Sequence, residues 1–175
     1  MTELCLIRHG ETDWNLNGLT QGSTDIPLND LGREQARITG VYVAEERWDA
    51  VYASDLSRAR ETAELIGAEV GLPNLVTDRR LRERGFGEAE GLEGAIRKSR
   101  YADSSSIPGA EPWDRVRERG IDFLEELVTK HVGQRLLVVS HGGLIISVLS
   151  HLSDGALIPG RPLLKNLSMS LVTYD

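Results

Sequence analysis

The chain has only one cysteine, Cys5, among its 175 residues. A single cysteine cannot form an internal disulfide, and no group of Cys and His residues has the spacing of a zinc site. Cys5 lies in the apolar run of residues 4–7, where we expect a buried strand thiol. This cysteine usage favours a reducing cytoplasm.

The sequence also lacks long apolar runs and an excess of positive charge. No stretch approaches the ~18 apolar residues of a membrane-spanning helix, and residues 1–3 lack the basic start of a signal peptide. The net charge of −7 opposes nucleic-acid binding, because phosphate backbones need a basic face. We expect neither membrane nor nucleic-acid partners, although a local pocket for a small anion is compatible with this charge.

The order of strand and helix patterns predicts the fold class. The length favours one domain over residues 1–175. Strands are expected at residues 3–7, 49–53, 75–77, 135–139 and 168–174, and helices at residues 30–47, 56–70, 112–131 and 143–152. Asn29 or Asp30 could cap the first of these helices. Residues 85–110 are rich in Gly, Ser and charge and predict a flap with one short helix. The alternation predicts a three-layer α/β/α sandwich with a mainly parallel central sheet.

Three short polar motifs stand where predicted strands have just ended. They are residues 8–10 (RHG), 54–58 (SDLSR) and 140–142 (SHG). Ligands bind at the carboxyl ends of the strands in such sheets, so these motifs should converge. Arg58 would lie in the first turn of its helix, where free N–H groups favour an anion. The glycines Gly10 and Gly142 allow close backbone approach. The set predicts a pocket for a tetrahedral dianion.

These residue types suit phosphoryl transfer. A neutral His9 imidazole is a competent nucleophile toward phosphorus, while Arg8, Arg58 and His141 could hold the equatorial oxygens. The leaving group needs a proton. Glu83, which follows the third strand, is the candidate donor, since burial and the charge of a bound phosphate would both favour its protonated form.

Each motif alone is weak, because a short match such as Arg-His-Gly also arises by chance. The two other histidines, His131 and His151, fall late in predicted helices. There a histidine commonly serves the helix dipole or the surface, so we expect no direct catalytic role for either. The joint placement of the motifs after strands is what supports the hypothesis of a phosphate site.

Five sequence blocks follow one another along the chain, within a resemblance that runs from residue 3 to about 174. They are residues 8–12 with 14–15, residues 22–28 with 32 and 35–36, residues 54–63, residues 81–83 with 86–87 and 90–91, and residues 140–143. Taken together, these blocks resemble the histidine phosphatase superfamily, the phosphoglycerate-mutase-like proteins.

The resemblance implies a role for each matched residue. It makes His9 the phosphorylated nucleophile, Glu83 the proton donor, and Arg8, Arg58 and His141 the phosphate pocket. It places Asn15, Gln21, Gly22 and the Gly142 amide on the substrate side, and Asn166 where some members have a pocket asparagine. It implies neither a metal nor a cofactor.

The chain departs from the mutase pattern in ways that favour a phosphatase. The segment between Gly91 and Gly109 is short, and Gln21-Gly22 resembles the phosphatase branch. Residues 109–111 depart from the family as a whole, since they read Gly-Ala-Glu where many members have Gly-Glu-Ser. A small open site admits water to the phosphohistidine. We therefore expect a phosphomonoesterase that acts on a small phosphorylated metabolite and releases inorganic phosphate. The alternatives are a phosphoglycerate-type mutase and a protein that binds phosphorylated ligands without turnover. The substrate and the oligomeric state stay open.

Overall fold

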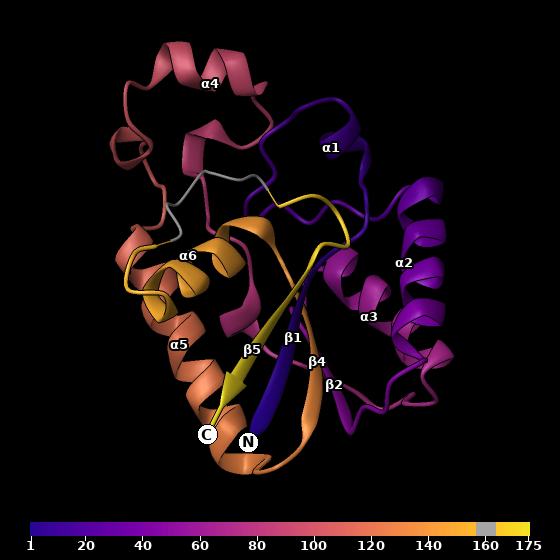
Figure 1. Cartoon of the computed structure of the whole chain (residues 1–175). Coiled ribbons are helices and arrows are strands. Elements are labelled where there is room, and N and C mark those ends of the chain that lie inside the picture. The colour runs from indigo at the N-terminus through magenta and orange to yellow at the C-terminus, as the bar shows by residue number, and fades with distance from the viewer. Residues whose placement is uncertain (157–163) are drawn as a thin grey trace.

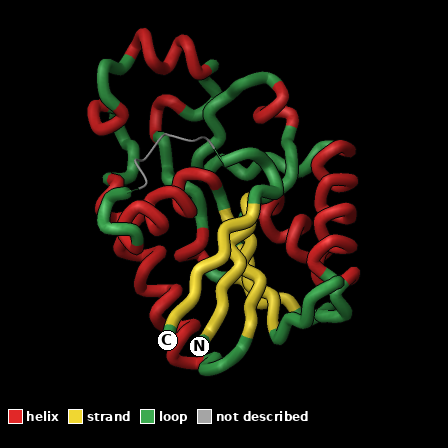
Figure 2. The backbone as a smooth tube through the Cα atoms, in the orientation of Figure 1, coloured by secondary structure: helices red, strands yellow, loops and turns green. Residues whose placement is uncertain are grey.

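The computed structural model describes residues 1–156 and 164–175 and contains a five-stranded sheet of order β3-β2-β4-β1-β5. The strands are β1 (Thr2–Arg8), β2 (Ala50–Ala53), β3 (Leu75–Thr77), β4 (Arg135–Ser140) and β5 (Met169–Tyr174). The first four run parallel, and β5 pairs antiparallel with β1 at one edge (Figure 2). The predicted mainly parallel sheet is confirmed.

Helices cover both faces of this sheet (Figure 1). The α-helices are α1 (Asp13–Leu16), α2 (Asp30–Val43), α3 (Ser57–Glu69), α4 (Gly94–Arg100), α5 (Trp113–Lys130) and α6 (Gly142–Leu152). Helices α2 and α3 lie on one face and α5 and α6 on the other, whereas α1 and α4 lie beyond the carboxyl ends of the parallel strands. In the described part of the chain, no helix combines the length and apolar character needed to span a membrane.

Alternating side chains of the strands build two hydrophobic cores. Leu4 and Leu6 of β1 pack in the cluster under α5 and α6, while Cys5 and Ile7 pack in the cluster under α2 and α3. This period of two is what a strand covered on both faces requires. Burial raises the pKa of the Cys5 thiol to about 11, which fits the predicted structural role.

Helix α2 is shorter than the predicted helix over residues 30–47. Asn29 is the N-cap, with its side chain accepting the N–H of Gly32 at 2.8 Å. The helix ends at Val43, whose carbonyl accepts the indole N–H of Trp48 at 2.8 Å. This side-chain contact satisfies a carbonyl that the helix end leaves free, and it could not be deduced from periodicity.

The flap over residues 85–110 contains more structure than the single short helix predicted. Besides α4 it has 3₁₀ turns at Gly87–Ala89 and Ser104–Ser106. Backbone hydrogen bonds tie it to the loop after α1: Thr20 donates to Leu92 and accepts from Gly91, and Gly94 donates to Gly18. A further 3₁₀ turn, Arg79–Leu81, follows β3.

The loop that follows β1 crosses α2 in direct backbone contact. A Cβ on Gly10 would lie 2.6 Å from the carbonyl oxygen of Gly32, and one on Gly32 would lie 2.1 Å from that of Glu11. Only glycine allows this approach at both positions. The contact fixes the backbone directly after His9.

Candidate active site

Strand register brings the two glycine-flanked histidines together. The β1–β4 pairing sets Arg8 opposite Ser140, so His9 and His141 leave the sheet side by side. The N–H of His9 donates to the Ser140 carbonyl at 2.9 Å, and the ring centroids of the two histidines are 5.1 Å apart. The predicted convergence of the first and third motifs is present in the structure.

The geometry of His9 fixes its tautomer. Its Nδ1 lies 2.7 Å from the carbonyl oxygen of Gly10, and because a carbonyl only accepts, Nδ1 carries the proton. Burial, then the charges of Arg58 and Arg8, lower the pKa of His9 well below 6.5. The ring is therefore neutral near pH 7, with its free lone pair on Nε2. Such a nitrogen can act as a nucleophile.

Two polar side chains hold the backbone around His9. The N–H of Gly10 donates to Thr62 Oγ1 at 3.0 Å, and that hydroxyl donates to the Arg58 carbonyl at 2.7 Å. Asn166 donates to the His9 carbonyl at 2.9 Å. Asn166 does not line the cavity itself, but its side-chain amide contacts two residues that do, donating to the His9 carbonyl and to Asn15 Oδ1.

Arg58 lies in the first turn of α3, as predicted, and it is fully buried. Its Nη1 and Nη2 donate to the carbonyls of Thr24 at 2.9 Å and Gly22 at 2.7 Å. Its Nε has no partner among the described residues. Burial lowers its pKa to about 10, which still leaves it charged near neutral pH. The first amide of α3 is not free for an anion, because Asp25 accepts the N–H of Ser57 at 2.8 Å.

Glu90 joins the flap to the loop that holds Arg58. Its Oε1 accepts the N–H of Ser23 and the N–H of Phe86, both at 2.9 Å, and its Oε2 accepts the N–H of Thr24 at 2.8 Å. Burial of Glu90 opposes ionisation, but these hydrogen bonds outweigh it and its pKa is lowered. The sequence analysis gave this glutamate no role beyond its place in the family blocks.

Glu83 lies at the N-terminus of α6. Its Oε2 accepts the N–H of Gly143 at 3.0 Å, and its Oε1 accepts the N–H groups of Leu144 at 3.2 Å and Arg84 at 2.9 Å. A Cβ on Gly143 would lie 2.4 Å from Glu83 Oε1, so this close approach requires glycine. The carboxyl group thus faces the same end of the sheet as His9, although no sequence pattern predicts its bonds to α6.

A cavity of about 680 Å³ contains the predicted residues. Its walls include Arg8, His9, Asn15, Gln21, Gly22, Arg58, Glu83 and Gly142. His141 does not line it and is fully buried; neither of its ring nitrogens has a partner among the described residues. Burial, then Arg58, lowers the pKa of His141 well below 6.5.

The outer part of this cavity contains residues that the sequence analysis missed. Arg97 and Lys98 come from α4, and Phe86, Tyr101 and Trp113 add aromatic rings. The Arg97 guanidinium lies 5.5 Å from the centre of the Phe86 ring. Phe86 falls in one of the family blocks but was given no role, and the other residues carry no motif. The pairing of the flap with the loop after α1 brings Arg97, Lys98 and Tyr101 to the site.

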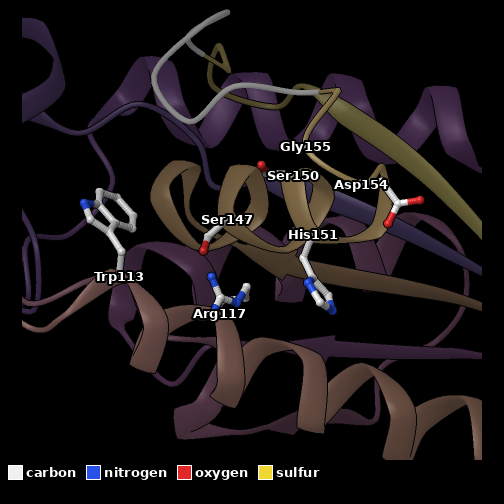
Figure 3. Close-up of a pocket in the computed structure, with 7 residues that line it drawn as sticks. All are labelled: Trp113, Arg117, Ser147, Ser150, His151, Asp154 and Gly155. Atoms are coloured by element: carbon white, nitrogen blue, oxygen red, sulfur yellow. The ribbon is translucent and has the colours of Figure 1, made fainter.

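The two remaining histidines lie outside the cavity of His9. His151 lines a separate hollow of about 310 Å³ between α5 and α6, together with Arg117 and Ser147 (Figure 3). His131 lies just past the end of α5, with Nε2 2.7 Å from the Tyr52 hydroxyl. Over residues 1–156 and 164–175, no cluster of three or more His, Cys, Asp or Glu side chains could hold a metal ion.

Comparison with known protein families identifies the family of this chain. The model of the histidine phosphatase superfamily (branch 1) matches residues 4–175. The chain belongs to the histidine phosphatase superfamily. The family proposed from the five sequence blocks is confirmed, and the sheet with its four covering helices is the fold shared with its structural neighbours.

Several proteins named as phosphatases are similar to this chain. The uncharacterized phosphatase PhoE of Bacillus subtilis is 41% identical over 155 residues, covering 89% of this chain and 79% of the relative. The metal-independent phosphoserine phosphatase of Arabidopsis thaliana is 38% identical, with 89% and 71% covered. The structure of a mycobacterial glucosyl-3-phosphoglycerate phosphatase with VO3 matches with a TM-score of 0.88 and 28% identity, covering 98% of this chain and 90% of that chain.

Mutases are also found among the relatives of this chain. The 2,3-bisphosphoglycerate-dependent phosphoglycerate mutase of Azorhizobium caulinodans is 31% identical over 188 residues, covering 94% of this chain and 91% of the mutase. The phosphatases above support a hydrolase, and they leave its substrate open.

Proposed function

We propose that this histidine phosphatase is a metal-independent phosphomonoesterase that hydrolyses a small phosphorylated metabolite through a phosphohistidine on His9. One observation carries the proposal. The neutral His9 ring presents an unprotonated Nε2 beside the guanidinium groups of Arg8 and Arg58, in a cavity that Glu83 also lines.

The first half of the reaction forms the phosphohistidine. Arg8 and Arg58 bind the phosphoryl oxygens, supplying the charge stabilisation that phosphoryl transfer needs. Nε2 of His9 attacks phosphorus as the bond to the ester oxygen breaks, and Glu83 gives its proton to that oxygen. His141 lies behind the cavity wall with its ring centroid 5.1 Å from that of His9, and we assign an N–H of its ring, which is unpartnered among the described residues, to a phosphoryl oxygen held at His9.

The second half returns the enzyme to its starting state. Water attacks phosphorus, the phosphorus–nitrogen bond breaks, and Glu83, now a carboxylate, takes the proton of the attacking water. Inorganic phosphate leaves and His9 is again neutral. Each residue ends in the protonation state in which it began, so no co-reactant beyond water is needed.

The outer cavity favours a substrate with a second negative group. Arg97 and Lys98 lie in the same cavity as the phosphate-binding arginines, and cations recognise a carboxylate well. Among the similar proteins, phosphoserine phosphatase and glucosyl-3-phosphoglycerate phosphatase are named for carboxylated phosphates. We therefore propose a phosphorylated carboxylic acid as the substrate class.

A substrate panel tests the proposed function. The wild type and His9→Ala are assayed in excess EDTA with p-nitrophenyl phosphate, carboxylated phosphomonoesters and matched esters without a carboxylate. We expect turnover by the wild type alone and a higher kcat/KM for the carboxylated esters. A wild type that binds these esters without releasing phosphate would support a ligand-binding protein instead.

The relationship to mutases makes mutase activity the second candidate. A mutase must keep water from its phosphohistidine while the substrate reorients. Incubation with 3-phosphoglycerate, with and without 2,3-bisphosphoglycerate, can be followed by phosphorus NMR. We expect free phosphate, whereas rapid formation of 2-phosphoglycerate with little free phosphate would establish the mutase.

A further inference from the structure

Arg119 of α5 lies outside the cavity of His9, yet it contacts the segment that carries Glu83. Its Nη1 donates to the carbonyls of Arg80 at 2.7 Å and Arg82 at 2.6 Å, and its Nη2 donates to the carbonyl of Glu83 at 3.2 Å. Only 19% of the Arg119 side chain is exposed. One side chain thus holds three carbonyls around the proposed proton donor.

Glu111 fixes the same guanidinium from the other side. Its Oε1 accepts Nε of Arg119 at 2.8 Å, and its Oε2 accepts Nη2 at 2.9 Å. Burial of Glu111 opposes ionisation, but the hydrogen bonds and charge of Arg119 outweigh it and lower its pKa. A guanidinium has five N–H donors, and here all of them have an acceptor.

The segment held by Arg119 is also tied to its surroundings by side chains: Arg82 makes two hydrogen bonds to Asp55, and Leu81 is buried in the core. The segment follows β3 at the edge of the sheet, after the last paired residue, Thr77. Ser140 donates to the Leu81 carbonyl at 2.7 Å, and the Glu83 carboxyl group accepts the α6 amides. Among the described residues, Arg119 is the donor to the carbonyls of Arg82 and Glu83 themselves, so Glu83 is held at its backbone by Arg119 and at its carboxyl group by α6.

We propose that Arg119, oriented by Glu111, is a positioning residue that sets the reach of Glu83 toward the leaving-group oxygen. The inference rests on the proposed function, in which Glu83 protonates that oxygen. The planar fork of arginine can hold several acceptors at fixed angles, and a lysine ammonium cannot reproduce this. Glu111 belongs to the Gly-Ala-Glu block where the sequence departs from the common family pattern, and this contact gives that block a role.

The test compares two esters on each variant. Glycerol phosphate has a poor leaving group that needs the proton, whereas p-nitrophenyl phosphate needs little protonation. For Arg119→Gln and Arg119→Lys, we expect kcat/KM to fall about tenfold or more on glycerol phosphate relative to p-nitrophenyl phosphate, because small misplacement of a catalytic group is costly. The ratio of kcat/KM on glycerol phosphate to kcat/KM on p-nitrophenyl phosphate does not depend on how much of a variant is folded.

Two further variants complete the test. Arg117→Gln removes a cation from the same helix without touching the Glu83 segment, and its ratio should equal that of the wild type. In Glu83→Gln the ratio should already be reduced, and adding Arg119→Gln should reduce it no further.

The outcomes separate this inference from the proposed function. Equal losses on both esters in the two Arg119 variants, with a reduced ratio in Glu83→Gln, would overturn the positioning role alone. A wild type without phosphatase activity, or an unchanged ratio in Glu83→Gln, would overturn the proposed reaction and this inference with it.

Discussion

At the scale of the residue, the proposed chemistry depends on the state of His9. The sequence identified His9, Arg8, Arg58 and Glu83 as candidates from their places after strands. It could not give the tautomer, because that depends on the bond between Nδ1 and the Gly10 carbonyl, which only the folded loop creates. Nor could it show that His141 is fully buried, with both ring nitrogens unpartnered among the described residues.

The pH dependence of stability follows from the two buried histidines. Their pKa values lie well below 6.5 in the folded chain, so below about pH 6.5 the unfolded chain binds protons that the folded chain does not. The contribution of these two histidines to the free energy of unfolding is therefore fully present above that pH and is lost as the pH falls below it. We expect the urea midpoint to drop between about pH 7.5 and about pH 5.5.

The variant His9→Asn serves as the control for this pH effect. It removes one of the two groups, so its urea midpoint should change less over the same pH range. Nitrogen-15 NMR of the wild-type ring should also show a protonated Nδ1 and an unprotonated Nε2 near neutral pH. A His9 ring that is charged at pH 7 would contradict this description of the nucleophile.

At the scale of the element, loops and helix ends supply the contacts that the sequence pattern does not reveal. Periodicity located the main strands and helices, since buried faces repeat at regular intervals. The end of α2 at Val43 and the structured flap could not be predicted, because they depend on a side-chain contact of Trp48 with Val43 and on the long-range backbone pairing of Thr20. The links of Thr62 and Glu90 to the site are hidden for the same reason.

Replacing Glu90 by glutamine tests the link between flap and phosphate pocket. An amide group would face N–H donors of residues 23 and 24, so the loop that holds Arg58 should shift. We expect kcat/KM to fall on the order of tenfold, equally for glycerol phosphate and p-nitrophenyl phosphate, because binding rather than protonation suffers.

Glu88→Gln is the matched control, since Glu88 is an exposed glutamate of the adjacent 3₁₀ turn. It should retain wild-type kinetics. If Glu90→Gln were as active as Glu88→Gln, the proposed connection from Glu90 to Arg58 would have to be abandoned.

At the scale of the whole molecule, the parallel sheet explains how distant motifs form one site. Neighbouring strands β1 and β4 end at the same edge, and the flap and α1 lie beyond it (Figure 1). This arrangement was predictable from strand order, because parallel strands bring their carboxyl ends together. The outer cavity was not, since Arg97, Lys98 and Tyr101 reach it only through the folded flap.

The metal independence that we propose would follow from this whole arrangement. Arg8 and Arg58 supply permanent positive charge where other phosphoryl-transfer enzymes use metal ions. We expect prolonged dialysis against EDTA to leave kcat and KM unchanged, and added Mg²⁺ or Zn²⁺ not to increase them. Loss of activity in EDTA with recovery on adding one metal would show that a cation takes part.

The most direct test is to trap the enzyme during turnover. Wild-type protein is mixed with labelled substrate, quenched rapidly without acid and analysed by mass spectrometry of its peptides. The proposed mechanism predicts a phosphoryl group on His9 that disappears as substrate is exhausted, and an inactive His9→Ala variant, because the covalent route then has no first step. Turnover without any phosphohistidine, with His9→Ala keeping most of its kcat, would contradict it.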